Sequence, residues 1–145
     1  MTALAPPHRF EVRVYYEDTD LAGIVYYANY LRFIERARSE WLRALGLDQV
    51  ALREEAGLVF AVRRIEADYL APARFDDLLA VETRVQAVTA ARLVLGQEVG
   101  RAGLPLFRAS VTLAAVGPQG RPLRLPRAVV AAAGAAIGQT PPAEG

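Results

Sequence analysis

Apolar side chains at every second position predict a β-strand over residues 10–16. Polar residues occupy most of the positions between them, so we expect this strand to bury one face and expose the other. The predicted buried face consists of Phe10, Val12, Val14 and Tyr16.

The spacing of apolar residues changes to three and four from position 27 onward, and charged residues fill much of the rest. This pattern predicts a long amphipathic helix, and Gly46 is placed to end it because glycine readily adopts the left-handed conformation found after helices. A shorter helical turn is predicted over residues 48–57. The apolar positions of the long helix are Tyr27, Tyr30, Ile34, Ala37, Trp41 and Leu45.

Four more alternating segments follow, and the connections between them are short enough for antiparallel neighbours. A turn at residues 117–120 and a modest helix over 127–138 complete the chain. The order of elements predicts an α+β fold in which one long central helix packs against a five-stranded, largely antiparallel sheet. The four segments span residues 58–70, 78–88, 91–100 and 103–116.

The chain has 145 residues, which suits a single domain over 1–145 with frayed ends at 1–8 and 139–145. Its 17 basic and 16 acidic residues nearly cancel, so we expect no binding of nucleic acid. The first residues lack the pattern of a signal peptide, and no apolar run approaches the ~20 residues that cross a bilayer. We therefore expect a cytoplasmic protein without membrane insertion.

The chemistry available to the protein is narrowed by its composition. There is no cysteine, and the single histidine, His8, follows two prolines in the segment expected to be frayed and solvated. Thiol nucleophiles, Ser-His-Asp triads, histidine-rich zinc sites and histidine-based dehydratase dyads are therefore disfavoured. We expect neither a metal nor another cofactor, and any catalysis must use carboxylates, hydroxyls and backbone amides.

The acidic loop (residues 17–26) concentrates carboxylates directly before the long helix. Its acidic residues are Glu17, Asp18 and Asp20, and one interpretation is that they are polar loop residues that bond nearby N–H groups. The spacing of Asp18, Asp20 and Gly23 also resembles the start of a calcium-binding loop. That hypothesis fails because alanine and asparagine stand at the fifth and twelfth positions, where calcium ligands are needed.

A further hypothesis combines the loop with the helix that follows it. The first N–H groups of a helix lack intrahelical partners and have partial positive charge. A carboxylate from Asp20 beside such an amide would place a nucleophile or general base next to an oxyanion donor, which is the minimum apparatus for acyl transfer. Gly23 would allow the close approach of backbone or ligand.

Two stretches resemble one known family. The run VYYEDTDLAGIVYYANYLRFIERARSEWLRALGL at 14–47 and the run VRRIEADYLAPARFDDLLAVETRV at 62–85 are similar to the 4-hydroxybenzoyl-CoA thioesterase-like hotdog family, especially its Tol-Pal-associated acyl-CoA thioesterase branch. The resemblance implies a helix wrapped by an antiparallel sheet, a homodimer or homotetramer with active sites at the subunit interface, and hydrolysis of an acyl thioester to a carboxylate and a thiol.

By this resemblance, Asp20 matches the catalytic aspartate, and Tyr27 lies where a backbone amide polarises the thioester carbonyl. The Tol-Pal branch usually has histidine at the position of Tyr27, so an imidazole contribution is absent here. Asp18 is expected to brace the loop, while Asn29 and Tyr30 are expected in the first helical turn and the core, respectively. Glu35 is interpreted as an ion-pair partner of Arg38 and not as the catalytic acid.

The predicted substrate-binding residues are Gly23, Arg92, Arg63 and Arg64, with the arginines as candidate partners of the CoA phosphates. The choice between CoA and another acyl carrier, the acyl preference, and nucleophilic against general-base attack stay open at this stage. The alternative functions are a non-catalytic acyl-CoA-binding hotdog module and an acyl-thioester hydratase, which the lack of a site histidine disfavours.

Overall fold

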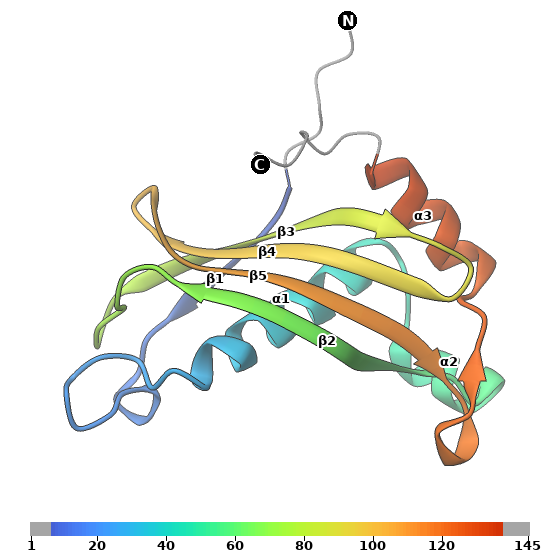
Figure 1. Ribbon diagram of the computed structural model, residues 1–145, viewed down its shortest axis with the longest axis horizontal. Helices are drawn as coiled ribbons and strands as arrows, with labels where there is room; N and C mark the ends of the chain where they lie inside the picture. Colours follow the sequence, from blue (N-terminus) through green and yellow to red (C-terminus); the bar gives the residue numbers. More distant parts are fainter. Residues whose placement is uncertain (1–6, 138–145) are drawn as a thin grey trace, which may run out of the picture.

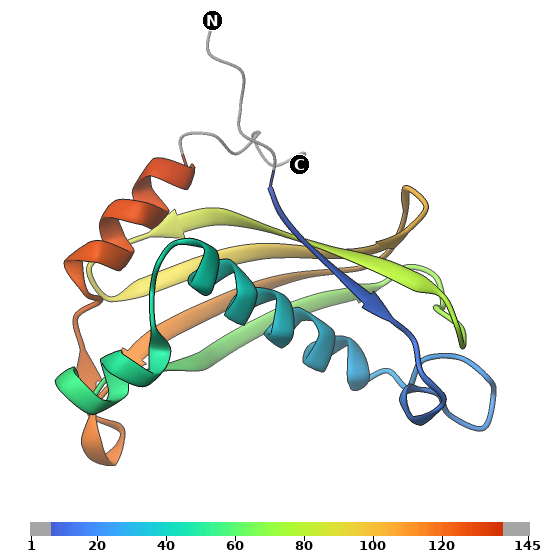
Figure 2. The same ribbon diagram turned by 180° about the vertical axis from the view of Figure 1, so that it is seen from behind.

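The computed structural model describes residues 7–137, which form an α+β fold of one sheet and three helices. The long helix α1 (Asn29–Ala44) lies across one face of the sheet (Figures 1 and 2). The shorter helices are α2 (Gln49–Ala56) and α3 (Arg127–Ile137). The strands are β1 (His8–Arg13), β2 (Val59–Tyr69), β3 (Leu78–Val88), β4 (Arg92–Arg101), β5 (Leu104–Val116) and β6 (Pro122–Leu123).

The strands are all antiparallel and follow the order β1-β3-β4-β5-β2, with β6 paired to the end of β5. Register shifts interrupt the ladders between Val62 and Arg64, between Val85 and Ala87, and between Val99 and Gly100. Such irregularities increase twist and bend a strand, which helps the sheet curve around α1. Strand β2 pairs only with β5, so its other edge is open within the described residues.

The four strands predicted after the long helix are confirmed to within one residue at every end, and the α+β prediction is confirmed. The predicted count of five strands omitted β6, which contains two residues and leaves no detectable periodicity. The turn at 117–120 is present as a short 3₁₀ helix, Pro118–Gly120.

Strand β1 differs from its prediction at both ends. It ends at Arg13, and Tyr16 instead begins a 3₁₀ turn with 83% of its surface exposed, so the prediction of a buried Tyr16 was wrong. The Asp18 carboxylate accepts a hydrogen bond from the Tyr15 N–H at 2.8 Å, which turns the chain away from the sheet. His8 is half-buried and pairs with Thr83 of β3, so its assignment to a solvated leader was also wrong.

Helix α1 begins two residues later than predicted and ends where expected. Gly46 follows its last turn with φ of 81°, a left-handed conformation that glycine adopts without strain. The buried face of α1 packs against β3 and β4, and Phe33 on this face is only 1% exposed. Burial of such a side chain is worth about 1.5–3 kcal/mol relative to leaving it in water.

A buried polar network lies between α1 and the sheet. The Arg38 guanidinium donates to Gln97 Oε1 at 3.0 Å, and the Gln97 amide donates to Thr83 Oγ1 at 3.0 Å. Burial lowers the pKa of Arg38, and the charge of Glu35 opposes that effect. Glu35 itself accepts a hydrogen bond from Ser39 at 3.1 Å and forms no ion pair with Arg38, so that predicted pair was wrong.

The predictions of fraying at 139–145 and at residues 1–6, and the predicted last helical residue at 138, lie outside the residues that the structure describes. Among the helices of residues 7–137, none combines the length and the apolar character needed to cross a membrane.

Candidate active site

The acidic loop lies at the end of the sheet where β3 begins, next to the connection between β2 and β3 (Figure 1). The Val25 N–H donates to the Ala73 carbonyl at 2.8 Å, and Ile24 forms an isolated bridge with Arg74. The Val14 N–H donates to the Asp77 carbonyl at 2.9 Å on the other side of the loop. These contacts anchor both ends of the loop to one connection and hold it at the start of α1.

Asp20 forms a tight turn inside this loop. Its Oδ1 accepts from the Ala22 N–H at 2.9 Å, and its carbonyl accepts from the Gly23 N–H at 3.0 Å. The side chain is exposed, and its second carboxylate oxygen accepts no hydrogen bond within residues 7–137. Asp20 is therefore held by one oxygen and free to act with the other.

Gly23 is required by the backbone conformation of this turn. Its φ is 79°, and an added Cβ would meet no atom within 4 Å. The predicted close approach of protein backbone at this position is therefore wrong for the chain by itself. The position instead borders open space beside Asp20, which leaves room for a ligand.

The turn at residues 26–29 presents a free backbone N–H. Tyr27 precedes α1 and is not part of it, because the Asn29 N–H donates to the Tyr26 carbonyl at 2.8 Å and the helix starts after that turn. Among the described residues, the Tyr27 N–H has no hydrogen-bond acceptor. Tyr27 is 62% exposed, so this residue lies at the surface of the molecule.

Asp18 and Asn29 brace the loop against the helix, as predicted for Asp18. The Asp18 carbonyl accepts from the Asn29 side-chain amide and from the Tyr26 N–H, both at 2.9 Å. Asn29 lies in the first turn of α1 and Tyr30 lies in the core at 3% exposure, which confirms both placements. The loop is thus held by hydrogen bonds that leave the second carboxylate oxygen of Asp20 without a partner among the described residues.

The pKa of Tyr26 is raised by its neighbours in the loop. It is raised first by the neighbouring Tyr27 hydroxyl and, as a smaller effect, by the charge of Asp20. The Tyr26 and Tyr27 rings are 4.7 Å apart. The two arms of the loop also pair with each other, because the Asp20 N–H donates to the Ile24 carbonyl and the Tyr26 N–H to the Asp18 carbonyl, both at 2.9 Å. Asp20 and the residues that lead into the turn at 26–29 therefore belong to one small hairpin.

The three candidate arginines do not lie at this loop within one chain. Arg92 begins β4 beside the last residues of β3, whereas the acidic loop contacts the start of β3, and ten strand residues span about 33 Å. Arg63 and Arg64 lie in the middle of β2 at its register shift, and Arg64 pairs with Glu66. A single chain thus assembles Asp20, Gly23 and Tyr27 but leaves the predicted phosphate ligands elsewhere.

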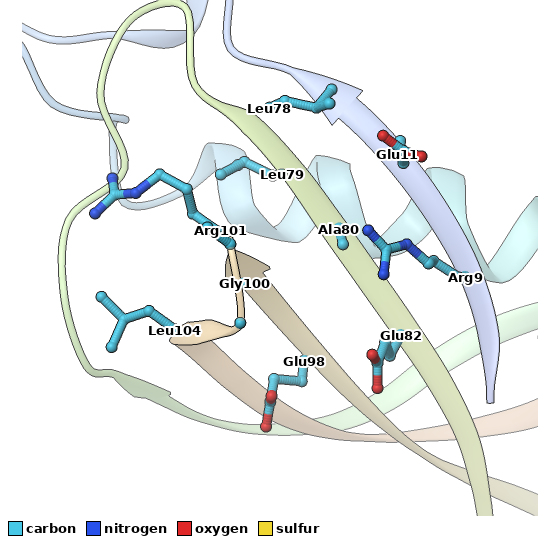
Figure 3. Close-up of a pocket in the computed structure, with 12 residues that line it drawn as sticks. Arg9, Glu11, Leu78, Leu79, Ala80, Glu82, Glu98, Gly100, Arg101 and Leu104 are labelled. Atoms are coloured by element: carbon cyan, nitrogen blue, oxygen red, sulfur yellow. The ribbon is translucent and has the colours of Figure 1, made fainter. Parts of the chain in front are cut away.

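A cleft of about 470 Å³ opens on the side of the sheet opposite α1. Figure 3 shows Arg9, Glu82 and Glu98 projecting from three neighbouring strands on this side, with α1 behind them. Neither Asp20 nor Tyr27 lines it. Within residues 7–137, no group of three or more histidine, cysteine or acidic side chains is arranged to hold a metal ion.

One residue of the site was missed in the sequence. The Tyr69 hydroxyl donates to the Tyr27 carbonyl at 2.9 Å across 42 positions of the chain. Its sequence signal is weak, since a tyrosine at the end of a predicted strand is common. A contact of this kind depends on how β2 lies relative to the start of α1.

An antiparallel sheet curved around a long helix, with a carboxylate and a free backbone N–H at the helix start, defines a hotdog-type acyl-transfer fold. The family model of the Thioesterase superfamily matches residues 22–106. The chain belongs to this superfamily, and the predictions of a hotdog fold and a thioester hydrolase are confirmed.

Individual relatives agree with this assignment. An "Acyl-CoA thioesterase YbgC" from Haemophilus influenzae is 47% identical over 124 residues, which cover 85% of this chain and 91% of the relative. A solved "Probable Thioesterase" from Bartonella henselae is 39% identical with a TM-score of 0.79, covering 83% of this chain and 99% of that one. A solved 4-hydroxybenzoyl CoA thioesterase complexed with 4-hydroxybenzoyl CoA has a TM-score of 0.83 at 23% identity, covering 89% and 99%, and supports the fold alone.

Proposed function

We propose that this chain hydrolyses acyl-CoA thioesters, with the Asp20 carboxylate and the Tyr27 N–H as its catalytic groups. The observation that supports these roles is that one loop carries a carboxylate oxygen at Asp20 and, at Tyr27 directly after it, a backbone N–H, both without protein partners among residues 7–137. The Tyr27 N–H would donate to the carbonyl oxygen of the thioester as negative charge develops on it.

Asp20 has two possible roles that give the same products. As a nucleophile, it attacks the carbonyl carbon, the C–S bond breaks, the thiolate takes a proton, and water then hydrolyses the mixed anhydride. As a general base, it takes a proton from the water that attacks the carbonyl, and that proton finally reaches the departing thiolate. Both routes consume one water and yield a carboxylic acid and free CoA.

The substrate assignment rests on the acyl-CoA named for the relatives and on space beside the loop. Gly23 borders open space, so an acyl thioester has room next to Asp20. Arg92, Arg63 and Arg64 are proposed to bind the phosphates of CoA from a second copy of the chain, because one copy places them away from the loop.

A second copy is also expected from the open edge of β2. This strand has 11 residues, and its exposed apolar side chains include Val59 at 41% and Val62 at 46%. A long strand edge with unpaired N–H and C=O groups favours pairing with another chain. We propose a homodimer or homotetramer joined through this edge, acting in the cytoplasm.

The alternative of a non-catalytic acyl-CoA-binding module predicts binding without turnover. The hydratase alternative is less favoured because His8 begins β1, which extends about 17 Å from His8 to Arg13 before the chain reaches the acidic loop. The deciding experiment incubates the purified protein with short-chain, long-chain and aromatic acyl-CoAs and detects released thiol. We expect thiol release from at least one class; binding of an acyl-CoA with no release from any class would favour the binding module.

A further inference from the structure

The backbone of Tyr27 is held at both of its peptide units. On the N-terminal side, the Tyr26 carbonyl accepts from the Asn29 N–H at 2.8 Å. On the C-terminal side, the Tyr27 carbonyl accepts from the Tyr69 hydroxyl at 2.9 Å. The first contact is local to the turn, whereas the second comes from the last residue of β2.

The Tyr27 N–H lies in the plane of the Tyr26–Tyr27 peptide unit, and the φ and ψ angles of Tyr27 relate this plane to the next one, which contains the Tyr27 carbonyl. Holding the second plane therefore limits how far the first can turn. Tyr27 is 62% exposed, and its ring contacts the rings of Tyr26 at 4.7 Å and Tyr69 at 6.4 Å, so few buried contacts hold this residue. An oxyanion donor must point at the position that the charged oxygen will occupy, and a loosely held donor loses much of its effect. A hydrogen bond from the sheet to this turn can therefore hold the Tyr27 N–H in a fixed direction.

The Tyr69 ring is itself fixed by aromatic neighbours. It contacts Phe107 edge-on, with ring centroids 5.0 Å apart, and Tyr30 at 5.7 Å. Phe107 and Tyr30 are buried and stack on each other at 5.0 Å. A tyrosine phenol ordinarily has a pKa of about 10, so the Tyr69 hydroxyl keeps its proton and can donate at neutral pH. Burial and, to a lesser degree, the neighbouring Tyr27 raise the pKa of Tyr69 further.

We propose that Tyr69 is a positioning residue, whose hydroxyl fixes the turn at residues 26–29 so that the Tyr27 N–H points at the thioester carbonyl. This inference rests on the proposed function. The hydroxyl does not touch the reacting atoms; it acts through the backbone of Tyr27.

The test compares Tyr69→Phe with Tyr16→Phe, which removes a phenol hydroxyl that has no hydrogen-bond partner within residues 7–137. The Tyr69→Phe ring can keep its contacts with Phe107 and Tyr30. We expect kcat to fall about tenfold in Tyr69→Phe, with KM and the melting temperature nearly unchanged, because loss of one positioning hydrogen bond acts on the transition state. Tyr16→Phe should stay within about twofold of the wild-type kcat.

A spectroscopic measurement separates positioning from general support of the fold. The acyl-CoA hydrolysed fastest in the screen above, with an isotope-labelled carbonyl, is bound to Asp20→Asn and to Asp20→Asn/Tyr69→Phe. Difference infrared spectra should show the carbonyl stretch lowered on binding in the first variant and shifted back toward its free value in the second, because the donor is less well aimed.

A Tyr69→Phe variant with wild-type kcat would overturn this inference, and so would a lowered kcat accompanied by an unchanged carbonyl stretch. Full activity of Asp20→Asn would instead overturn the catalytic roles proposed above. The two failures are distinguishable because they appear in different variants.

Discussion

Replacement of Asp20 by asparagine removes the charge of the proposed catalytic group while keeping its shape. A positioned base is worth about 10²–10⁴ in rate, or roughly 3–5 kcal/mol of barrier, so we expect kcat to fall by that factor. The turn should survive, because an asparagine oxygen can still accept the Ala22 hydrogen bond now made at 2.9 Å by Asp20 Oδ1. The change in unfolding free energy should therefore be below about 1 kcal/mol, which corresponds to a few degrees in melting temperature.

The assay is steady-state thioester hydrolysis, with thermal melts and gel filtration on the same samples. Asp18→Asn is the matched control, since it removes one charge from the same loop at a residue whose carboxylate bonds the Tyr15 N–H. We expect this control to lose less than about tenfold in kcat. If Asp20→Asn is folded, keeps the wild-type oligomeric state and retains a near-wild-type kcat, the carboxylate mechanism is refuted, and Glu35 becomes the acid to test.

Three further predictions concern binding, acid stability and assembly. Arg92→Ala should raise KM for acyl-CoA more than it lowers kcat, and an equal penalty with acyl-pantetheine, which lacks the nucleotide, would contradict the phosphate role. The pKa of Asp77 is lowered overall, because burial, which would raise it, is outweighed by hydrogen bonds from the Arg74 N–H and from Arg101 at 2.6 Å. The stability that the Asp77 carboxylate contributes is therefore complete above its unfolded-state pKa and is lost as pH falls through its folded-state pKa. The difference in melting temperature between wild type and Asp77→Asn should accordingly close below about pH 4. A difference that is constant with pH would contradict this reasoning. Sedimentation should give a dimer or tetramer, and a stable, active monomer at micromolar concentration would refute pairing through β2.

Local patterns in the sequence determined most of the secondary structure. Strands β2 to β5 and the end of α1 shortly before Gly46 follow from side-chain periodicity and backbone preference, which depend on residues close in the chain. The acidic loop was recognisable for the same reason, because Asp20, Gly23 and Tyr27 lie within eight consecutive positions. The interpretation of the Asp18 side chain as a brace was correct, because its carboxylate accepts from the Tyr15 N–H only three positions away.

Contacts between distant segments could not be predicted from these patterns. Periodicity placed Arg38 beside Glu35 on the helix, but strand β4 brought Gln97 to it from 59 positions away. In the same way, β2 supplies Tyr69 to the turn before α1, and β4 places Arg92 at the far end of the sheet. Strand order and register decide which distant residues become neighbours, and both result from packing the whole sheet on α1. Only the tertiary structure therefore decided which side chains meet at the candidate site.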